Sequence, residues 1–350
     1  MRAIRIREPG GPDVLELVER DDPVAGAGAV VVRVRCAGIN RADLLQRLGR
    51  YPAPRDVPAD IPGLEFAGEI ETVGAGVSGR SAGDRVMGIL GGGGYAERAA
   101  VPAGQLLAVP PGLSWREAGA IPEVFLTAAD ALVERGGLRP GERAVVHTAG
   151  GGVGTAALQL ARAIGAASII GTASAGKLEK IREAGLPLDL GVDRHAGSFA
   201  DEVARHTAGV GADVILDTVG APYWEANMAS LATLGRLVIV GVLGGMRVQA
   251  DLRQLMGKRA TVVGTVLRAR SKAEKAQLTE MFATRFLPGF TAPDEDSSRL
   301  RPVIDRAFPL AEAAEAHRYV ESNRSFGKVL LDIDAGFSGR GRATGLDSQD

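Results

Sequence analysis

The stretch RAVVHTAGGGVGTAALQLARAIG, residues Arg143–Gly165, decides the fold of this chain. Its first part predicts a buried strand over Ala144–His147, and the spacing of its later apolar residues predicts a helix over Gly152–Ile164. The glycines between the two elements let the backbone turn sharply and approach a ligand closely. Because the unpaired N–H groups of the new helix face this turn, we expect the turn to bind a phosphate group.

The run A-G-G-G-V-G, which begins at residue 149, is a variant of the dinucleotide-binding fingerprint. A glycine run alone is weak evidence, because an ordinary strand-to-helix turn has a similar composition. Here the strand before the run and the amphipathic helix after it favour a cofactor site. We therefore expect Gly151, Gly152 and Val153 to contact the pyrophosphate, and Gly154 to let the helix pack tightly on its strand.

Strands and helices alternate from Arg143 to about Leu267. Helical stretches of about a dozen residues between strands are typical of right-handed crossovers and of a parallel sheet covered on both faces. Six strands fit a complete, doubly wound dinucleotide-binding domain. The predicted strands are Ala144–His147, Ser168–Thr172, Leu188–Val192, Asp213–Asp217, Arg236–Gly241 and Ala260–Leu267.

Residues 1 to about 123 instead show short β-branched strands separated by proline and glycine turns, which predicts a small, twisted barrel-like domain. A last strand, Gly327–Ile333, lies outside the alternation, and we place it back on the first domain. The expected division is therefore residues 1–123 with about 290–335 as one discontinuous domain, and 124–289 as the cofactor domain. Residues 336–350 contain almost no apolar residue and predict a disordered tail.

Composition limits the possible settings and partners. The chain has 350 residues, one cysteine and a formal net charge of −1. The charge balance gives no reason to expect nucleic acid or an anionic membrane as a partner. The single cysteine, Cys36, excludes an internal disulfide, and no apolar run is long enough to span a bilayer. We expect a cytoplasmic protein.

The residues after the second strand of the alternation indicate which cofactor is used. NAD sites of this type have an acid about 20 residues past the glycines, which bonds the ribose 2′-hydroxyl. Here Ser174 and Lys177 stand at that place without a carboxylate, and Arg194 follows the third strand. A hydroxyl and two cations suit a 2′-phosphate, so the sequence favours NADPH. The alternative for Lys177 is a solvated lysine at the start of a helix.

At this point the chain resembles the zinc-free medium-chain dehydrogenases/reductases of the quinone oxidoreductase (zeta-crystallin-like) group. The matching motifs run in order from Pro9 to Val329, nearly the whole chain. The resemblance implies a GroES-like β-barrel-type catalytic domain and a Rossmann cofactor domain. The motifs are Asn40–Leu44, Gly83–Val86, Ala120–Glu123, Gly152–Ala156 and Tyr223–Glu225.

The same alignment of motifs predicts a site without metal. In zinc-dependent relatives a cysteine and the histidine of a Gly-His-Glu motif occupy the places of Asn40 and Leu64. An amide and a leucine replace them here, and the four-cysteine zinc loop is absent. The four histidines show no paired metal spacing.

The resemblance also implies site residues. Asn40 is expected near the nicotinamide ribose, and Tyr51 at the substrate mouth, where its hydroxyl can bond a quinone oxygen. A loop tyrosine lying on the surface is the alternative for Tyr51, and a plain helix-terminal acid is the alternative for Asp43, the expected partner of Asn40. Thr127 is expected to approach the nicotinamide. The carboxamide is expected to meet the backbone of Gly241, Val242 and Leu243.

We therefore expect an NADPH-dependent quinone oxidoreductase that transfers a hydride or single electrons, acts without zinc and forms a homodimer through edge strands of the cofactor sheet. Two alternatives remain: an enal or enone reductase, and a low-turnover NADPH-binding protein with an RNA-binding or structural role. One departure bears on the substrate. In a tumour-suppressor-induced member of the family a Leu-Ser pair occupies the place of Gly150-Gly151.

Overall fold

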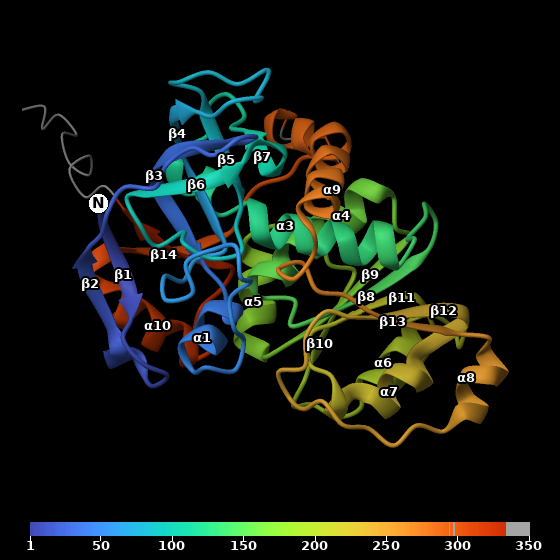
Figure 1. The fold of residues 1–350 in the computed structure, drawn as a ribbon. Coiled ribbons are helices and arrows are strands. Elements are labelled where there is room, and N and C mark those ends of the chain that lie inside the picture. Colours follow the sequence, from blue (N-terminus) through green and yellow to red (C-terminus); the bar gives the residue numbers. More distant parts are fainter. Residues whose placement is uncertain (294, 297, 334–350) are drawn as a thin grey trace, which may run out of the picture.

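The computed structural model describes residues 1–333 except 294 and 297, so the predicted disordered tail lies outside the described residues. Two large β-sheets organise the chain, and Figure 1 shows the helices around them. A separate two-stranded sheet pairs β1 (Arg2–Ile6) antiparallel with β2 (Leu15–Glu19).

A seven-stranded sheet holds the catalytic half of the molecule. Its central strand, β3, pairs antiparallel with β4, β6 and β15, so the last strand of the chain lies beside one of the first. The strands are β3 (Ala29–Ile39), β4 (Glu65–Val73), β5 (Arg85–Ile89), β6 (Arg98–Pro102), β7 (Leu106–Ala108), β14 (Ile304–Pro309) and β15 (Lys328–Asp332). Helices α1 (Arg41–Arg47) and α10 (Ala313–Glu321) belong to this half.

The second sheet has six parallel strands in the order β10-β9-β8-β11-β12-β13. This is the doubly wound order, in which two halves diverge from the first strand, β8. The strands are β8 (Arg143–His147), β9 (Ser168–Ala173), β10 (Leu190–Asp193), β11 (Ala212–Asp217), β12 (Leu231–Ile239) and β13 (Thr261–Gly264). The connecting helices are α4 (Gly152–Ile164), α5 (Ala175–Glu183), α6 (Phe199–His206), α7 (Trp224–Ser230) and α8 (Leu252–Lys258).

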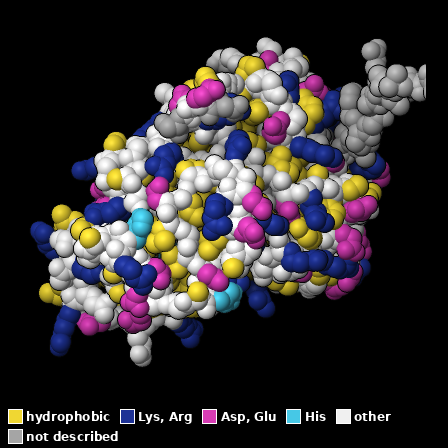
Figure 2. All heavy atoms as spheres, turned by 180° about the vertical axis from the view of Figure 1, so that it is seen from behind, with side chains coloured by type: hydrophobic (Ala, Val, Ile, Leu, Met, Phe, Trp, Pro, Cys, Tyr) yellow, Lys and Arg dark blue, Asp and Glu magenta, His cyan; other side chains and the backbone are white. Residues whose placement is uncertain are grey.

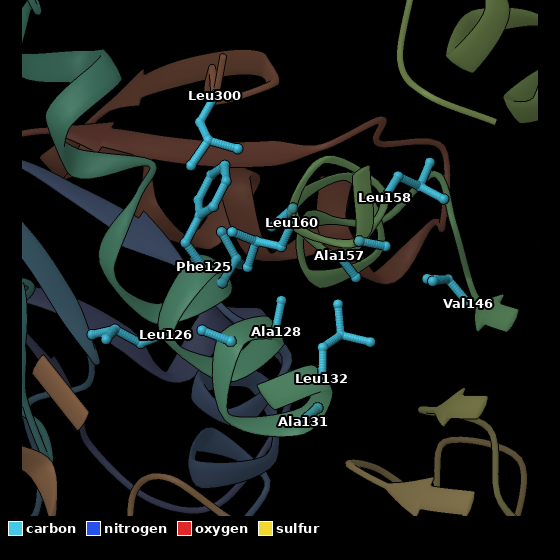
Figure 3. Close-up of a cluster of buried hydrophobic side chains, with 14 of the residues drawn as sticks. Phe125, Leu126, Ala128, Ala131, Leu132, Val146, Ala157, Leu158, Leu160 and Leu300 are labelled. Carbon is cyan, nitrogen blue, oxygen red and sulfur yellow. The ribbon is translucent and has the colours of Figure 1, made fainter. Parts of the chain in front are cut away.

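Apolar side chains cover both faces of the parallel sheet. In β8, Ala144 and Val146 join one buried cluster with residues of α4, whereas Val145 joins another with residues of α6 and α7. The first cluster also includes α3 (Pro122–Ala129) and α9 (Lys272–Arg285). Figure 3 shows Phe125 pointing toward Leu300 and Leu132 pointing toward Ala157 of α4. A doubly wound parallel-sheet domain and a separate, mainly antiparallel β-domain are thus both present, which confirms the predicted α/β fold class.

Two local predictions were wrong. The sequence between the predicted strands Asp213–Asp217 and Arg236–Gly241 predicts a helix over Trp224–Leu234, but α7 ends at Ser230 and β12 begins at Leu231. The last four residues pack as a strand, since tertiary contacts with β11 override their helical propensity. The strand β14 was not predicted. It pairs with β15, and no local pattern in the sequence indicates this pairing. Pro122 begins α3, a position that suits proline because its missing N–H is not needed there.

Candidate active site

The glycine turn leaves its outer side open. Gly154 is required by packing, because a Cβ there would lie 2.3 Å from the carbonyl oxygen of Thr148. A Cβ at Gly151 would meet only that same oxygen, at 3.3 Å. Gly151 has a φ of −88°, so its conformation is open to any residue, and the turn instead places Thr148 at a φ of 51°.

The first turn of α4 can accept an anion. The residues from Gly151 to Val153 are partly exposed, whereas the rest of the helix as far as Leu160 is buried. In the described chain, the N–H group of Val153 has no acceptor, whereas the backbone just before it is engaged by the bridge between Gly151 and Gly327. Free donors at the positive end of a helix are the feature that binds pyrophosphate in dinucleotide folds.

Three cations gather where β9 ends without an acid. Lys177 lies on α5, Arg194 follows β10, and Arg41 begins α1 of the other half. Burial, and then the positive charges of Arg41 and Arg194, lower the pKa of Lys177. Asp305 opposes this shift. Mutual repulsion in a half-buried place would be relieved by a dianion, so this cluster suits a phosphate. Ser174 caps the same helix.

The position of the family's first zinc ligand is held by a buried polar cluster. The amide of Asn40 donates from Nδ2 to Oε1 of Glu65 over 2.9 Å and accepts at Oδ1 from Nζ of Lys328 over 2.8 Å. Lys328 also lies 2.5 Å from Oε1 of Glu65. Both ends of the Asn40 amide are therefore engaged within the protein, and its contact with a cofactor ribose stays a prediction.

Asp43 lies inside the catalytic half rather than on an open surface. It is fully buried and accepts from the N–H groups of Asn40 and Gly63 and from the hydroxyl of Tyr95. Burial raises the pKa of Asp43 to about 6, although these hydrogen bonds act in the opposite direction. The carboxylate anchors the start of α1, so the expectation that Asp43 contacts the cofactor gains no support from this geometry.

Tyr51 is half-buried beside Arg268. The guanidinium carbon of Arg268 lies 5.1 Å from the ring centroid, and its Nη1 donates to the Tyr51 carbonyl over 3.0 Å. Arg268 also donates hydrogen bonds to the carbonyl of Gly91 and to Oε1 of Gln46. One buried arginine therefore holds together several loops of the catalytic half. The Tyr51 hydroxyl has no partner among the described residues, and burial raises the pKa of Tyr51. It is free to donate to a ligand.

Thr127 and the loop after β12 occupy the places expected for them in the fold, but no contact tests their roles. Thr127 lies on α3 and is partly exposed. In the loop, Gly241 and Leu243 donate backbone N–H groups to the carbonyls of Asp217 and Thr218, at the carboxyl end of β11. The N–H of Val242 has no acceptor in the described chain.

The donor set does not fit zinc. Leu64 offers no ligand atom, and the oxygens of Glu65 are taken by Lys328, Asn40 and the N–H of Glu123. Among the residues that the structure describes, no group of three or more histidine, cysteine or acidic residues could hold a metal ion. The zinc-free site remains a prediction.

Arg41, Glu65, Arg268 and Lys328 were not expected at the site from the sequence. Each is far along the chain from the residues it contacts, and Glu65 and Lys328 lie in stretches that look like ordinary strands. Two signals did exist: β4 and β15 each begin with a charged residue, Glu65 and Lys328, directly before an apolar residue that is buried.

A doubly wound domain with an open glycine turn, joined to a GroES-like domain, defines a nucleotide-dependent oxidoreductase. Comparison with known proteins agrees. Residues 152–284 match the zinc-binding dehydrogenase family, and residues 26–111 match the alcohol dehydrogenase GroES-like domain. The chain is 32% identical to a rat quinone oxidoreductase over 95% of this chain and 97% of the relative. It is 32% identical to a rat synaptic vesicle membrane protein VAT-1 homolog over 95% and 84%.

Solved structures share the fold over the same extent. A quinone oxidoreductase of Pseudomonas syringae matches with a TM-score of 0.82 at 31% identity, covering 95% of this chain and 99% of that one. The CurK enoyl reductase matches with 0.81 at 29% identity, covering 95% and 98%. A mycobacterial protein solved with NADPH matches with 0.81 at 30% identity, covering 95% and 100%.

The chain belongs to the medium-chain dehydrogenase/reductase family, with quinone oxidoreductases among its relatives. It is an oxidoreductase that uses NADH or NADPH, as the sequence motifs predicted. No helix in the described part of the chain is long and apolar enough to cross a membrane.

Proposed function

We propose that this protein is an NADPH-dependent quinone oxidoreductase that works without zinc. The observation that carries the choice of NADPH is the cluster of Arg41, Lys177 and Arg194 at a strand end that lacks an acid. A carboxylate there would hold the ribose 2′-hydroxyl of NADH and repel a 2′-phosphate. The mycobacterial neighbour, which was solved with NADPH, supports the same choice.

The residues of this chain would bind and orient the two reactants. The open first turn of α4 would hold the pyrophosphate, and the backbone of Gly241–Leu243, in which the N–H of Val242 is free, would meet the carboxamide. When bound, NADPH supplies the hydride. The Tyr51 hydroxyl would donate a hydrogen bond to the acceptor oxygen as negative charge develops there.

A quinone suits this site because it is already electron-poor. Without a metal to act as a Lewis acid, oxidation of an alcohol loses its usual driver. Reduction of a quinone needs mainly positioning and one hydrogen-bond donor. The rat and Pseudomonas syringae relatives that bear the name quinone oxidoreductase support this substrate class.

A conjugated enal or enone is the second candidate acceptor, and the likeness to the CurK enoyl reductase favours it. Quinones and conjugated enals or enones both accept hydride at a carbon or oxygen atom of a polarised π-system. The same arrangement of cofactor and Tyr51 therefore suits either class of acceptor. A low-turnover NADPH-binding protein with an RNA-binding role is less well supported. On the face shown in Figure 2, basic and acidic side chains are interspersed, and the net charge is −1.

We further propose a homodimer in the cytoplasm. The strand β13 is an edge of the parallel sheet, and apolar side chains near it in the chain are exposed, which is typical of an interface. They include Met246 at 77%, Leu252 at 64%, Met256 at 75% and Val266 at 54%. The cytoplasmic setting is supported by Cys36, which is free and buried.

The test of the proposed function is NADPH oxidation followed by absorbance with ortho-quinones, para-quinones and enals in parallel. We expect quinones to give the highest kcat/KM. A higher kcat/KM with enals would support the second candidate, and tight NADPH binding without turnover on any acceptor would support a binding protein.

A further inference from the structure

Helix α3 has one open face. Its side chains are buried except those of Glu123 and Thr127, which lie four residues apart and therefore on the same side of the helix. The neighbouring Val124 contacts the glycine turn, since a Cβ at Gly152 would lie 2.9 Å from its Cγ1. The open face of α3 thus begins beside the first turn of α4, where the cofactor is proposed to bind.

The carboxyl group of Glu123 has no partner. Its backbone N–H donates to Oε2 of Glu65 over 2.8 Å, which fixes the start of α3. Neither carboxyl oxygen makes a hydrogen bond or ion pair with any described residue, and the side chain is partly exposed. A polar group that is left free on the open face of a helix is available to a ligand.

Glu123 interacts electrostatically with Tyr51 and with Arg268. The charge of Glu123 raises the pKa of Tyr51 and opposes the lowering of the pKa of Arg268 by burial. Glu123 therefore lies within electrostatic reach of the hydroxyl proposed to bind the acceptor and of the arginine that holds the Tyr51 loop.

The charges around Glu123 favour its protonated form. Four elements present charged groups to it: Glu65 on β4, Asp43 on α1, Lys328 on β15 and Lys275 on α9. Burial and then the negative charge of Glu65 raise the pKa of Glu123 to about 8, against the opposing effect of Lys328 and Lys275. At neutral pH the group is mostly an acid with a proton to give.

We propose that Glu123 is the catalytic acid that delivers a proton to the reduced acceptor. This inference rests on the proposed function. The acceptor gains a hydrogen and two electrons from NADPH, which is oxidised to NADP⁺, and negative charge develops on its oxygen. The O–H bond of Glu123 then breaks as an O–H bond forms on the acceptor, and the resulting carboxylate regains a proton from water.

Glu123 is better suited to this step than Tyr51. A proton donor works best when its pKa lies near the operating pH, which holds for Glu123 and not for a tyrosine whose pKa is raised. Tyr51 would bind the acceptor oxygen, and Glu123 would neutralise it. For an enone the same acid would protonate the carbon next to the carbonyl group after hydride addition.

The kinetic test compares Glu123→Gln with the wild-type protein across pH, using one good quinone. The amide keeps the size of the side chain but has no proton to transfer. We expect wild-type kcat to fall as pH rises through about 8, the value to which the pKa of Glu123 is raised. In Glu123→Gln this fall should vanish and kcat should drop by about 10²- to 10⁴-fold, with NADPH affinity unchanged. Glu123→Asp, which keeps an acid, should retain part of the activity.

Glu134→Gln is the matched control, because Glu134 is an exposed glutamate without a partner just beyond the same helix. It should behave as wild type. A second readout needs no turnover: infrared titration should show a protonated carboxyl band at neutral pH that Glu123→Gln lacks.

Wild-type kcat and pH profile in Glu123→Gln would overturn this inference and leave the proposed function standing. Identical intensity of the protonated carboxyl band at neutral pH in the wild-type protein and in Glu123→Gln would also overturn it. A wild-type protein that binds NADPH but reduces no acceptor would overturn both.

Discussion

The ammonium group of Lys328 lies 2.5 Å from a carboxylate oxygen of Glu65, and the two side chains are 3% and 0% exposed. The pair joins β15 to β4, across a separation of 263 residues in the sequence. The methylene groups of Lys328 also run along the glycine turn, because a Cβ at Gly152 would lie 2.9 Å from its Cδ. One buried lysine therefore connects the place of the family's zinc ligand with the cofactor turn.

Replacing Lys328 by methionine should destabilise the protein by about 3–5 kcal/mol, because the charge of Glu65 would remain buried without a partner. Adding Glu65→Gln should recover part of this loss, since the second change removes the uncompensated charge. Urea denaturation measures both. Lys180→Met, at an exposed lysine, is the control and should change the free energy of unfolding by less than about 0.5 kcal/mol. If Lys328→Met and Lys180→Met changed the free energy of unfolding by the same small amount, the stabilising role of the Lys328–Glu65 pair would be contradicted.

Two glycines of the turn should respond differently to substitution. Gly154→Ala should cost about 1–3 kcal/mol of stability, because its Cβ would overlap the Thr148 carbonyl. Gly151→Val should fold well, yet bind NADPH at least tenfold more weakly, a loss of about 1.4 kcal/mol, since its side chain would occupy the ligand side of the turn. Thermal unfolding and calorimetric titration separate the two effects. Unchanged NADPH affinity in Gly151→Val would mean that the turn is only architectural.

Tyr51→Phe should lower kcat/KM for quinones by about 10- to 100-fold while NADPH affinity stays constant. The loss corresponds to about 1.4–2.7 kcal/mol for one hydrogen bond to a partly developed oxyanion. Phenylalanine keeps the ring under Arg268, so Tyr51→Ala should add a packing defect that Tyr51→Phe lacks. Steady-state kinetics of both variants with one quinone is the measurement. A wild-type kcat/KM in Tyr51→Phe would show that the Tyr51 hydroxyl does not bind the acceptor oxygen.

The stability of the protein should depend on Glu123 in one pH range. The pKa of this group is raised from 4.5 to about 8 in the folded protein. Between these values the folded state holds a proton that the unfolded state has lost, so the contribution of Glu123 to stability falls as pH rises. Glu123→Gln should lack this pH-dependent loss. Its free energy of unfolding should therefore rise relative to that of the wild-type protein between pH 5 and pH 8. If the denaturation midpoints of the wild-type protein and of Glu123→Gln changed by the same amount over this pH range, the raised pKa of Glu123 would be contradicted.

The cofactor half could be read from the sequence because its information is local. Strand, glycine turn and helix follow one another from Arg143 to Gly165, and the resulting elements β8 and α4 have the expected bounds to within a residue. The ring of charges around Asn40 could not be read in this way. Lys328 is 288 residues from Asn40, and only the pairing of β15 with β3 brings the two together.

The cations show the same limit. Lys177 was identified from its place after the second strand and Arg194 from its place after the third, whereas Arg41 reaches them from the other half of the molecule. The sequence around Arg41 predicts only the start of a helix. An arginine side chain at such a position is normally solvated, so nothing in the sequence places it at the cofactor. Glu123 was recognised as part of a family motif, but nothing in the motif shows that its carboxyl group lacks a partner.

Calorimetric titration with NADPH and NADH tests most directly the claim that Arg41, Lys177 and Arg194 select a 2′-phosphate. The wild-type protein should bind NADPH at least tenfold more tightly, a difference of about 1.4 kcal/mol. Lys177→Ala should remove most of this gap without weakening NADH, and Lys180→Ala, an exposed cation one turn away, should leave it intact. Equal affinities of the wild-type protein for the two cofactors would contradict the account.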